Sequence, residues 1–171
     1  MSEIVFTHLT HEDLVAGVHA IAAAAADWAP TLLVGVGRGG LVPAVYLSHR
    51  MGLPTVSVDH SSGIAAFGEA RIAPLAARTQ QGDRLLFVED INDSGRTIGE
   101  LRAMLAAHDA RADQVRFAVL LDNIRSAERT DYAHRTIDRS ITKDWFVFPW
   151  EAVAPEAAIA KDAAEVPERI A

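Results

Sequence analysis

The chain has 171 residues, enough for one domain of ordinary size, and half of them are apolar, so it can bury a substantial core. Its net charge of −7 argues against nucleic acid as a partner, and the absence of cysteine excludes disulfides, thiolate nucleophiles and cysteine-ligated metals. The first residues lack the positive charge of a signal peptide and the longest apolar run is too short to span a bilayer, which predicts a cytoplasmic protein that does not bind membranes.

The first predicted helix begins after Thr10, which is followed by an acid at the third helical position in a variant of the capping box, and it ends before Pro30. Residues 31–36, TLLVGV, form a continuous apolar run that is typical of a strand buried on both faces. A second helix is predicted over Val42–Met51, with Gly52 as its C-cap.

Further strands are predicted at residues 54–58, 85–88 and 117–121, and a helix at 97–107. Strands that alternate with helices in this way favour a doubly wound α/β fold with a mainly parallel sheet covered on both sides. Between Asp59 and Gly82 the pattern breaks over a stretch too long for an ordinary connector, which is typical of a lid or of a disordered segment.

The interpretation is a single domain in three parts. The core covers about residues 10–122. A polar stretch that turns aromatic, about residues 123–151, is predicted to form a small appendage, called the hood below, rather than the next βα unit, and the N-terminal residues could contribute to it. The tail, residues 152–171, is expected to be a short helix or loosely held.

The glycine loop, residues 35–40 with sequence GVGRGG, follows a predicted strand and matches the dinucleotide fingerprint, with Asp59 at the required distance. That pattern favours an NAD(P)-dependent oxidoreductase. A second interpretation is that the glycines only permit a tight turn, which leaves Arg38 unexplained. Against the dinucleotide site, the acids that follow the strand at 85–88 would have no role.

The acid loop, residues 88–97 with sequence VEDINDSGRT, places Glu89, Asp90 and Asp93 close together. It is not a calcium loop, because the twelfth position would be Leu101 rather than glutamate. Apart from a solvated turn, the remaining interpretation is a ligand site. Ser94 and its neighbours at a helix start aim N–H groups and hydroxyls at one point, as a bound phosphate requires, while the preceding acids suit a sugar diol or Mg²⁺.

This loop resembles the phosphoribosyl-diphosphate motif of the type I phosphoribosyltransferases, in which two acids are followed by two residues, Asp, Ser or Thr, Gly, any residue and Thr. The stretch LLVGVGRGGLVPA is similar to the pyrophosphate loop of that family. The ending WFVFPWE is similar to that of the small xanthine-guanine and hypoxanthine phosphoribosyltransferases. The resemblance covers roughly residues 31–151 and implies the type I phosphoribosyltransferase fold.

The resemblance also implies roles for individual residues. Glu89 and Asp90 would bind the ribose hydroxyls and Mg²⁺, and Asp93 would be a general acid/base near the base's imidazole nitrogens. Arg38 would stabilise the leaving diphosphate. The implied phosphate contacts come from Asp93, Ser94, Gly95, Arg96 and Thr97 for the 5′-phosphate and from Gly37, Arg38, Gly39 and Gly40 for the diphosphate.

For the base, the resemblance implies stacking on Trp145 and recognition of the base's edge by the backbone of Phe146, whereas Trp150 is expected to pack beneath the hood. A cis peptide bond is expected between Gly37 and Arg38.

Two features depart from the family pattern. A lysine that contacts the base in purine relatives is replaced here by Asp122 and Asn123, so the identity of the base stays open; Asn123 could donate to a carbonyl. The lid has Ser61 and Ser62 but no tyrosine, and its candidate phosphate partners are Arg71 and Arg78.

The resulting prediction is an enzyme of purine salvage that transfers a 5-phosphoribosyl group from phosphoribosyl diphosphate to a nucleobase, most simply a 6-oxopurine, with Mg²⁺. The chain is expected to form a dimer or tetramer. A non-catalytic sensor on the same fold is the first alternative, and the NAD(P)-dependent oxidoreductase is the second.

Overall fold

The computed structural model describes residues 4–59 and 65–164, with the side chains of residues 65–69 left out of the description. The strands are β1 Phe6–His8, β2 Leu32–Val36, β3 Thr55–Val58, β4 Leu85–Asn92, β5 Val115–Asn123, β6 Tyr132–Ile137 and β7 Trp145–Val147. The α-helices are α1 His11–Ala25, α2 Gly37–Met51, α3 Ala65–Gln80, α4 Arg96–Ala107 and α5 Glu156–Ala164.

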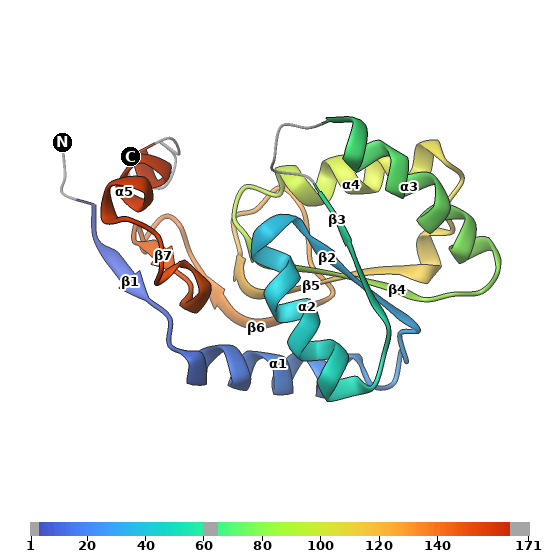
Figure 1. Cartoon of the computed structure of the whole chain (residues 1–171), viewed down its shortest axis with the longest axis horizontal. Helices are drawn as coiled ribbons and strands as arrows, with labels where there is room; N and C mark the ends of the chain where they lie inside the picture. Colours follow the sequence, from blue (N-terminus) through green and yellow to red (C-terminus); the bar gives the residue numbers. More distant parts are fainter. Residues whose placement is uncertain (1–3, 60–64, 165–171) are drawn as a thin grey trace.

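Five strands form a parallel sheet in the order β3-β2-β4-β5-β6 (Figure 1). Along the chain, β3 is added on one side of β2, and the later strands are added on the other side. The order therefore reverses between β2 and β4, and the loops that follow these two strands leave the same carboxyl edge of the sheet. This is the topological switch point at which open α/β sheets bind ligands. The doubly wound fold expected from the sequence is confirmed.

Apolar side chains alternate along the buried strands and supply a separate core on each face of the sheet. On one face, Leu33 and Leu86 pack with buried residues of α1 and α2. On the other face, Val34 and Phe87 pack with residues of α3 and α4. The strands can be apolar on both faces because helices cover both.

The first helix begins as predicted. The Thr10 side chain accepts a hydrogen bond from the backbone N–H of Asp13 at 3.1 Å, and the Asp13 carboxylate accepts one from the backbone N–H of Thr10 at 2.8 Å. This reciprocal pair is a capping box. Gly52 ends α2 in the left-handed conformation, with a φ of 68°, as expected of a C-cap.

The start of α2 differs from the prediction. The helix begins at Gly37 rather than at Val42. No peptide bond among residues 4–59 and 65–164 is cis, so the cis bond expected between Gly37 and Arg38 is wrong. Gly37 instead turns the chain from β2 into α2 with a φ of 55°, a conformation that glycine adopts without steric cost.

The segment between β3 and β4 is more regular than predicted. Residues 65–80 form α3, and its side chains Ile72, Leu75 and Ala76 are buried in the core beside β3 and α4. The lid residues Ser61 and Ser62 lie outside the described residues.

The polar stretch after β5 also differs from the prediction, because it contains β6, which pairs with β5 and continues the sheet. The aromatic segment then returns as β7, which pairs in parallel with β1 from the N-terminus, with Phe6 opposite Trp145. Figure 1 shows this β1–β7 pair and α5 lying together at one side of the sheet. No helix in the described ranges is long and apolar enough to cross a membrane.

Candidate active site

The acid loop lines a cavity of about 170 Å³ at the carboxyl end of β4. Glu89 and Asp90, the acids at this end of the strand, are both half-buried. The Asp90 carboxylate accepts a hydrogen bond from the backbone N–H of Ile91 at 2.7 Å, and the Thr97 hydroxyl donates to Glu89.

Burial and, secondarily, the neighbouring charge of Asp90 raise the pKa of Glu89 to about 8, against the opposing effect of the Thr97 hydrogen bond. Ligand hydroxyls that donate hydrogen bonds, or a cation, would relieve the repulsion between the Glu89 and Asp90 carboxylates. The acid pair is therefore suited to either kind of ligand. No cluster of three or more potential metal ligands occurs in the described part of the chain. Two adjacent carboxylates nevertheless fit Mg²⁺, which commonly takes one or two protein carboxylates and completes its shell with water and substrate phosphate.

The start of α4 forms a cradle suited to a phosphate. Gly95 has a φ of 88° and packs so closely that a Cβ would lie 2.6 Å from the backbone nitrogen of Glu128. The first turn of α4 contains no acid, and Gly95 as N-cap makes no side-chain hydrogen bond. The Ser94 hydroxyl accepts a hydrogen bond from the Arg96 backbone N–H at 3.3 Å, but no carboxylate in the first turn neutralises the positive end of this helix, which therefore suits an external anion. In α1, by contrast, the first turn carries Glu12 and Asp13.

The start of α2 has the same property, since its first turn contains no acid and its N-cap Val36 makes no side-chain hydrogen bond. The glycine loop also lies directly against the acid loop. A Cβ on Gly39 would lie 2.1 Å from an Asp90 carboxylate oxygen, and one on Gly40 would lie 2.0 Å from the carbonyl oxygen of Val88. The exposed Arg38 belongs to this turn. The two loops predicted to hold phosphates therefore meet at the switch point.

A second cavity of about 190 Å³ adjoins the first, with which it shares Asp90 and Ile91. Its other lining residues are Arg139, Trp145, Phe146, Phe148 and Glu151. Strand β7 brings Trp145 and Phe146 to this cavity, where the sequence predicts the base. Trp150 instead stacks on Phe148 with ring centroids 4.9 Å apart and packs against the core, in agreement with the packing role expected for it.

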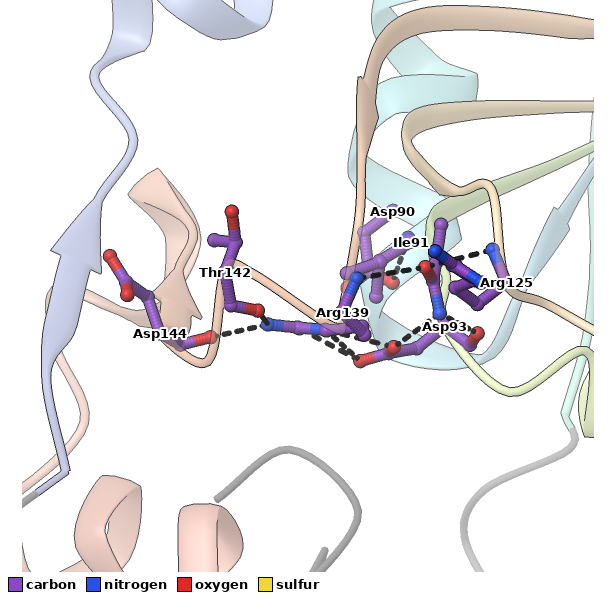
Figure 2. A network of polar contacts seen from close by, with 8 residues as sticks. Asp90, Ile91, Asp93, Arg125, Arg139, Thr142 and Asp144 are labelled. Atoms are coloured by element: carbon purple, nitrogen blue, oxygen red, sulfur yellow. Dashed lines mark hydrogen bonds and ion pairs between the residues drawn. The ribbon is translucent and has the colours of Figure 1, made fainter. Parts of the chain in front are cut away.

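Arg139 is a site residue that the sequence did not predict (Figure 2). It is 7% exposed, and its Nη2 donates to an Asp93 carboxylate oxygen at 2.8 Å, while its Nε donates to the other at 3.0 Å. Its Nη1 donates to the carbonyl oxygens of Asp144 at 2.7 Å and Thr142 at 3.2 Å. No spacing in the polar stretch singles out this arginine, and only the need for a cation beside Asp93 could have suggested one.

Asn123 and Asp122, which stand where a base-binding lysine was expected, are engaged within the protein. The buried Asn123 donates to the carbonyl oxygen of Asp93 at 2.9 Å and accepts from the backbone N–H groups of Arg125 and Arg139. Asp122 accepts from the side-chain amide of Asn92 at 2.7 Å. This geometry differs from the expectation that Asn123 donates to the base, because its amide instead joins three loop segments.

One of the two predicted lid cations lies away from the site. Arg78 pairs with Asp83 at 2.9 Å, and Asp83 precedes β4 and so lies at the opposite edge of the sheet from the acid loop. The prediction that Arg78 is a phosphate partner is therefore wrong. Arg71 is exposed on α3.

The dinucleotide interpretation of the glycine loop also meets an obstacle. The Asp90 carboxylate packs against Gly39, next to the place that a dinucleotide pyrophosphate would occupy. Without a metal ion, two anions would repel one another there. The fold and this edge thus define a doubly wound α/β protein in which two helix starts without acids in their first turns lie beside an acid pair.

Residues 3–156 match the phosphoribosyl transferase domain family. The chain belongs to this family.

Relatives differ in the bases for which they are named. An orotate phosphoribosyltransferase from Bartonella quintana (strain Toulouse) is 34% identical over 99 residues, which are 58% of this chain and 46% of that protein. The chain thus matches about half the length of this curated relative.

Two solved structures resemble the whole fold. A purine phosphoribosyltransferase from Pyrococcus horikoshii Ot3 has a TM-score of 0.65 at 22% identity, covering 89% of this chain and 97% of its own. The xanthine-guanine-hypoxanthine phosphoribosyltransferase of Helicobacter pylori has a TM-score of 0.63 at 18% identity, covering 92% and 99%.

Proposed function

We propose that the protein transfers the 5-phosphoribosyl group from phosphoribosyl diphosphate to a ring nitrogen of a nucleobase and releases diphosphate. The observation that carries this proposal is the pair of adjoining cavities that share Asp90 and Ile91. One cavity offers a phosphate cradle beside two acids, and the other offers aromatic rings. A base and a sugar phosphate could therefore lie end to end, with the bond between them forming near Asp90.

The donor occupies the first cavity in this proposal. The N–H groups at the start of α4 bind the 5′-phosphate, and Glu89 and Asp90 accept hydrogen bonds from the ribose hydroxyls. The N–H groups at the start of α2 and the Arg38 guanidinium hold the diphosphate, whose negative charge grows as the glycosidic bond breaks. Glu89 and Asp90, together with the donor's own oxygens, would hold Mg²⁺, which would further stabilise that leaving group.

The base occupies the second cavity, stacked on Trp145 and recognised at its edge by the backbone of Phe146. Asp93, an acid-loop residue that lines the first cavity and is bound by Arg139 from the wall of the second, is the group that exchanges a proton with the base. The preferred substrate in this proposal is a 6-oxopurine, which the names of the two structural neighbours support and which would make the reaction a step of purine salvage. Orotate is the second candidate, supported by the Bartonella relative.

The assembly and location also belong to the proposal, as a cytoplasmic dimer or tetramer. Leu41 and Val45 lie one turn apart on α2, each more than a third exposed, and would suit a subunit interface. Light scattering on the purified chain gives the mass: a dimer or tetramer is expected, and a monomer at micromolar concentration would contradict this part.

The test of the function is an incubation with Mg²⁺, phosphoribosyl diphosphate and, separately, hypoxanthine, guanine, xanthine, adenine and orotate. Diphosphate and a nucleoside monophosphate should form with at least one oxopurine. Product with orotate alone would replace the purine by a pyrimidine. Tight donor binding without product on any base would favour the non-catalytic sensor, and binding of NAD(P) in place of the donor would favour an oxidoreductase.

A further inference from the structure

The proposed reaction assigns no role to Arg139, although this arginine contacts Asp93. It lies in the segment between β6 and β7, on the wall of the second cavity, and its side chain is nearly inaccessible to solvent. Its guanidinium carbon lies 5.1 Å from the centre of the Phe146 ring, a distance typical of cation–π contact. A charge buried this deeply needs partners, and its partners identify its role.

The guanidinium joins two parts of the molecule that are distant in sequence. On one side Nε and Nη2 donate hydrogen bonds to the two carboxylate oxygens of Asp93, at 3.0 and 2.8 Å. On the other side Nη1 donates to the carbonyls of Thr142 and Asp144, and Asp144 directly precedes Trp145. Figure 2 shows Arg139 lying between these two sets of acceptors.

A second contact fixes the main chain of the same two residues. The Asn123 amide donates to the Asp93 carbonyl, and its oxygen accepts from the Arg139 backbone N–H at 3.2 Å. Asp93 is thus held through its carboxylate by Arg139 and through its carbonyl by Asn123. The rotation of the carboxylate and the position of the chain that leads into β7 are consequently set by one network.

Resting on the proposed function, we propose that Arg139 is a positioning residue for the base: it aims the Asp93 carboxylate and sets the start of β7 in the same step. The ring on which the base stacks and the group that exchanges its proton then keep a fixed relation. The planar fork of an arginine suits this role, because it can engage a carboxylate with one edge and backbone carbonyls with the other. A lysine could satisfy only part of this set.

The experiment compares Arg139→Met and Arg139→Lys with Arg125→Met in the full chain. Arg125 is the matched control, because its guanidinium pairs with Asp138 of the same segment at 3.1 Å, and only its backbone touches Asn123. The measurements are the affinity for phosphoribosyl diphosphate with Mg²⁺ by calorimetry, and kcat and KM for the best base of the panel. Circular dichroism confirms that each variant is folded.

If Arg139 orients the Asp93 carboxylate, replacing it should lower kcat and leave the affinity for phosphoribosyl diphosphate nearly unchanged. For Arg139→Met we expect kcat to fall about 100-fold, the cost typical of a misplaced reacting group, while the donor affinity changes less than about threefold. Arg139→Lys should recover part of the loss, to within about tenfold of the unchanged protein, and Arg125→Met should stay within about twofold. A purely structural ion pair would lower the melting temperature without separating kcat from donor affinity.

Each other outcome overturns a distinct statement. If folded Arg139→Met keeps kcat within about threefold, or if Arg125→Met loses as much, the positioning role is wrong although the function stands. If Arg139→Met does not fold, Arg139→Lys decides, and unchanged turnover in that variant rejects the role. If the unchanged protein makes no product from any base, the proposed function fails, and the role of Arg139 fails with it.

Discussion

Gly39 and Gly40 are neighbours at the start of α2, yet they face different groups of the acid loop. A Cβ on Gly39 would press on the end of the Asp90 side chain, whereas one on Gly40 would press on the main chain of β4 at Val88. A side chain can rotate away, but the middle of a strand cannot. A methyl group at Gly39 should therefore affect ligand binding, whereas a methyl group at Gly40 should affect the stability of the fold.

Gly39→Ala should displace the Asp90 carboxylate and weaken the binding of phosphoribosyl diphosphate by about tenfold or more, while the free energy of unfolding changes by less than about 1 kcal/mol. Calorimetric titration with Mg²⁺ present and urea denaturation measure the two effects. Donor affinity equal to that of the unchanged protein would show that Asp90 does not contact the donor.

Gly40→Ala should instead destabilise the fold by about 2–3 kcal/mol, because backbone must shift to admit the methyl group. Urea denaturation measures the difference, with Val45→Ala, an exposed change on the same helix, as the control expected to stay within about 0.5 kcal/mol. Equal stability of Gly40→Ala and Val45→Ala would be incompatible with the tight packing of the two loops.

At the scale of elements, the sequence predicted those that depend on local patterns. Strands β2, β4 and β5 are continuous apolar runs, and α1 and α4 follow a cap or a motif, so each could be identified from its own residues. Helix α3 was missed because Pro74 interrupts the apolar spacing of Ile72, Leu75 and Ala76, and tertiary packing decides its structure. Strand β6 was missed because its exposed residues give no strand pattern until β5 pairs with it.

The candidate site divides in the same way. The glycine loop and the acid loop are contiguous motifs, so their residues could be named in advance. Arg139 meets Asp93 across 46 residues, and this pairing follows from how the chain enters β7 rather than from any spacing in the sequence. The engagement of Asn123 by backbone groups has the same origin.

The capping box of α1 gives an element-scale prediction about pH. The backbone N–H and hydroxyl of Thr10 and, more weakly, Arg135 hold the pKa of Asp13 at about 2, below its ordinary value of 3.8. A carboxyl whose pKa is lower in the folded state stabilises the fold above its unfolded pKa, and this contribution is lost as the pH falls through the folded pKa.

The Asp13→Asn variant should therefore be less stable than the unchanged protein at pH 6, by about 1 kcal/mol, and the difference should shrink between pH 4 and about pH 2. Urea denaturation across this range measures it. A stability difference that stays constant down to pH 2 would show that the charge of Asp13 does not contribute to the cap.

At the scale of the whole molecule, the donor should link the two loops that leave the carboxyl edge of the sheet after β2 and β4. A ligand that binds only the folded state raises the free energy of unfolding, by about 2.7 kcal/mol at one hundred times its dissociation constant. Phosphoribosyl diphosphate with Mg²⁺ should accordingly raise the melting temperature by several degrees, and EDTA should remove most of that increase. An increase that is the same with and without Mg²⁺ would contradict a role for the metal in donor binding.

The central claim, that the acid pair and the two helix starts bind a phosphoribosyl donor for transfer, is tested most directly by diphosphate release from phosphoribosyl diphosphate. The assay is run with Mg²⁺ and the panel of bases, on the unchanged protein and on Asp90→Asn. The account predicts release that depends on a base in the unchanged protein and falls about 100-fold or more in Asp90→Asn. Equal release by the two proteins, or none by the unchanged protein with any base, would contradict it.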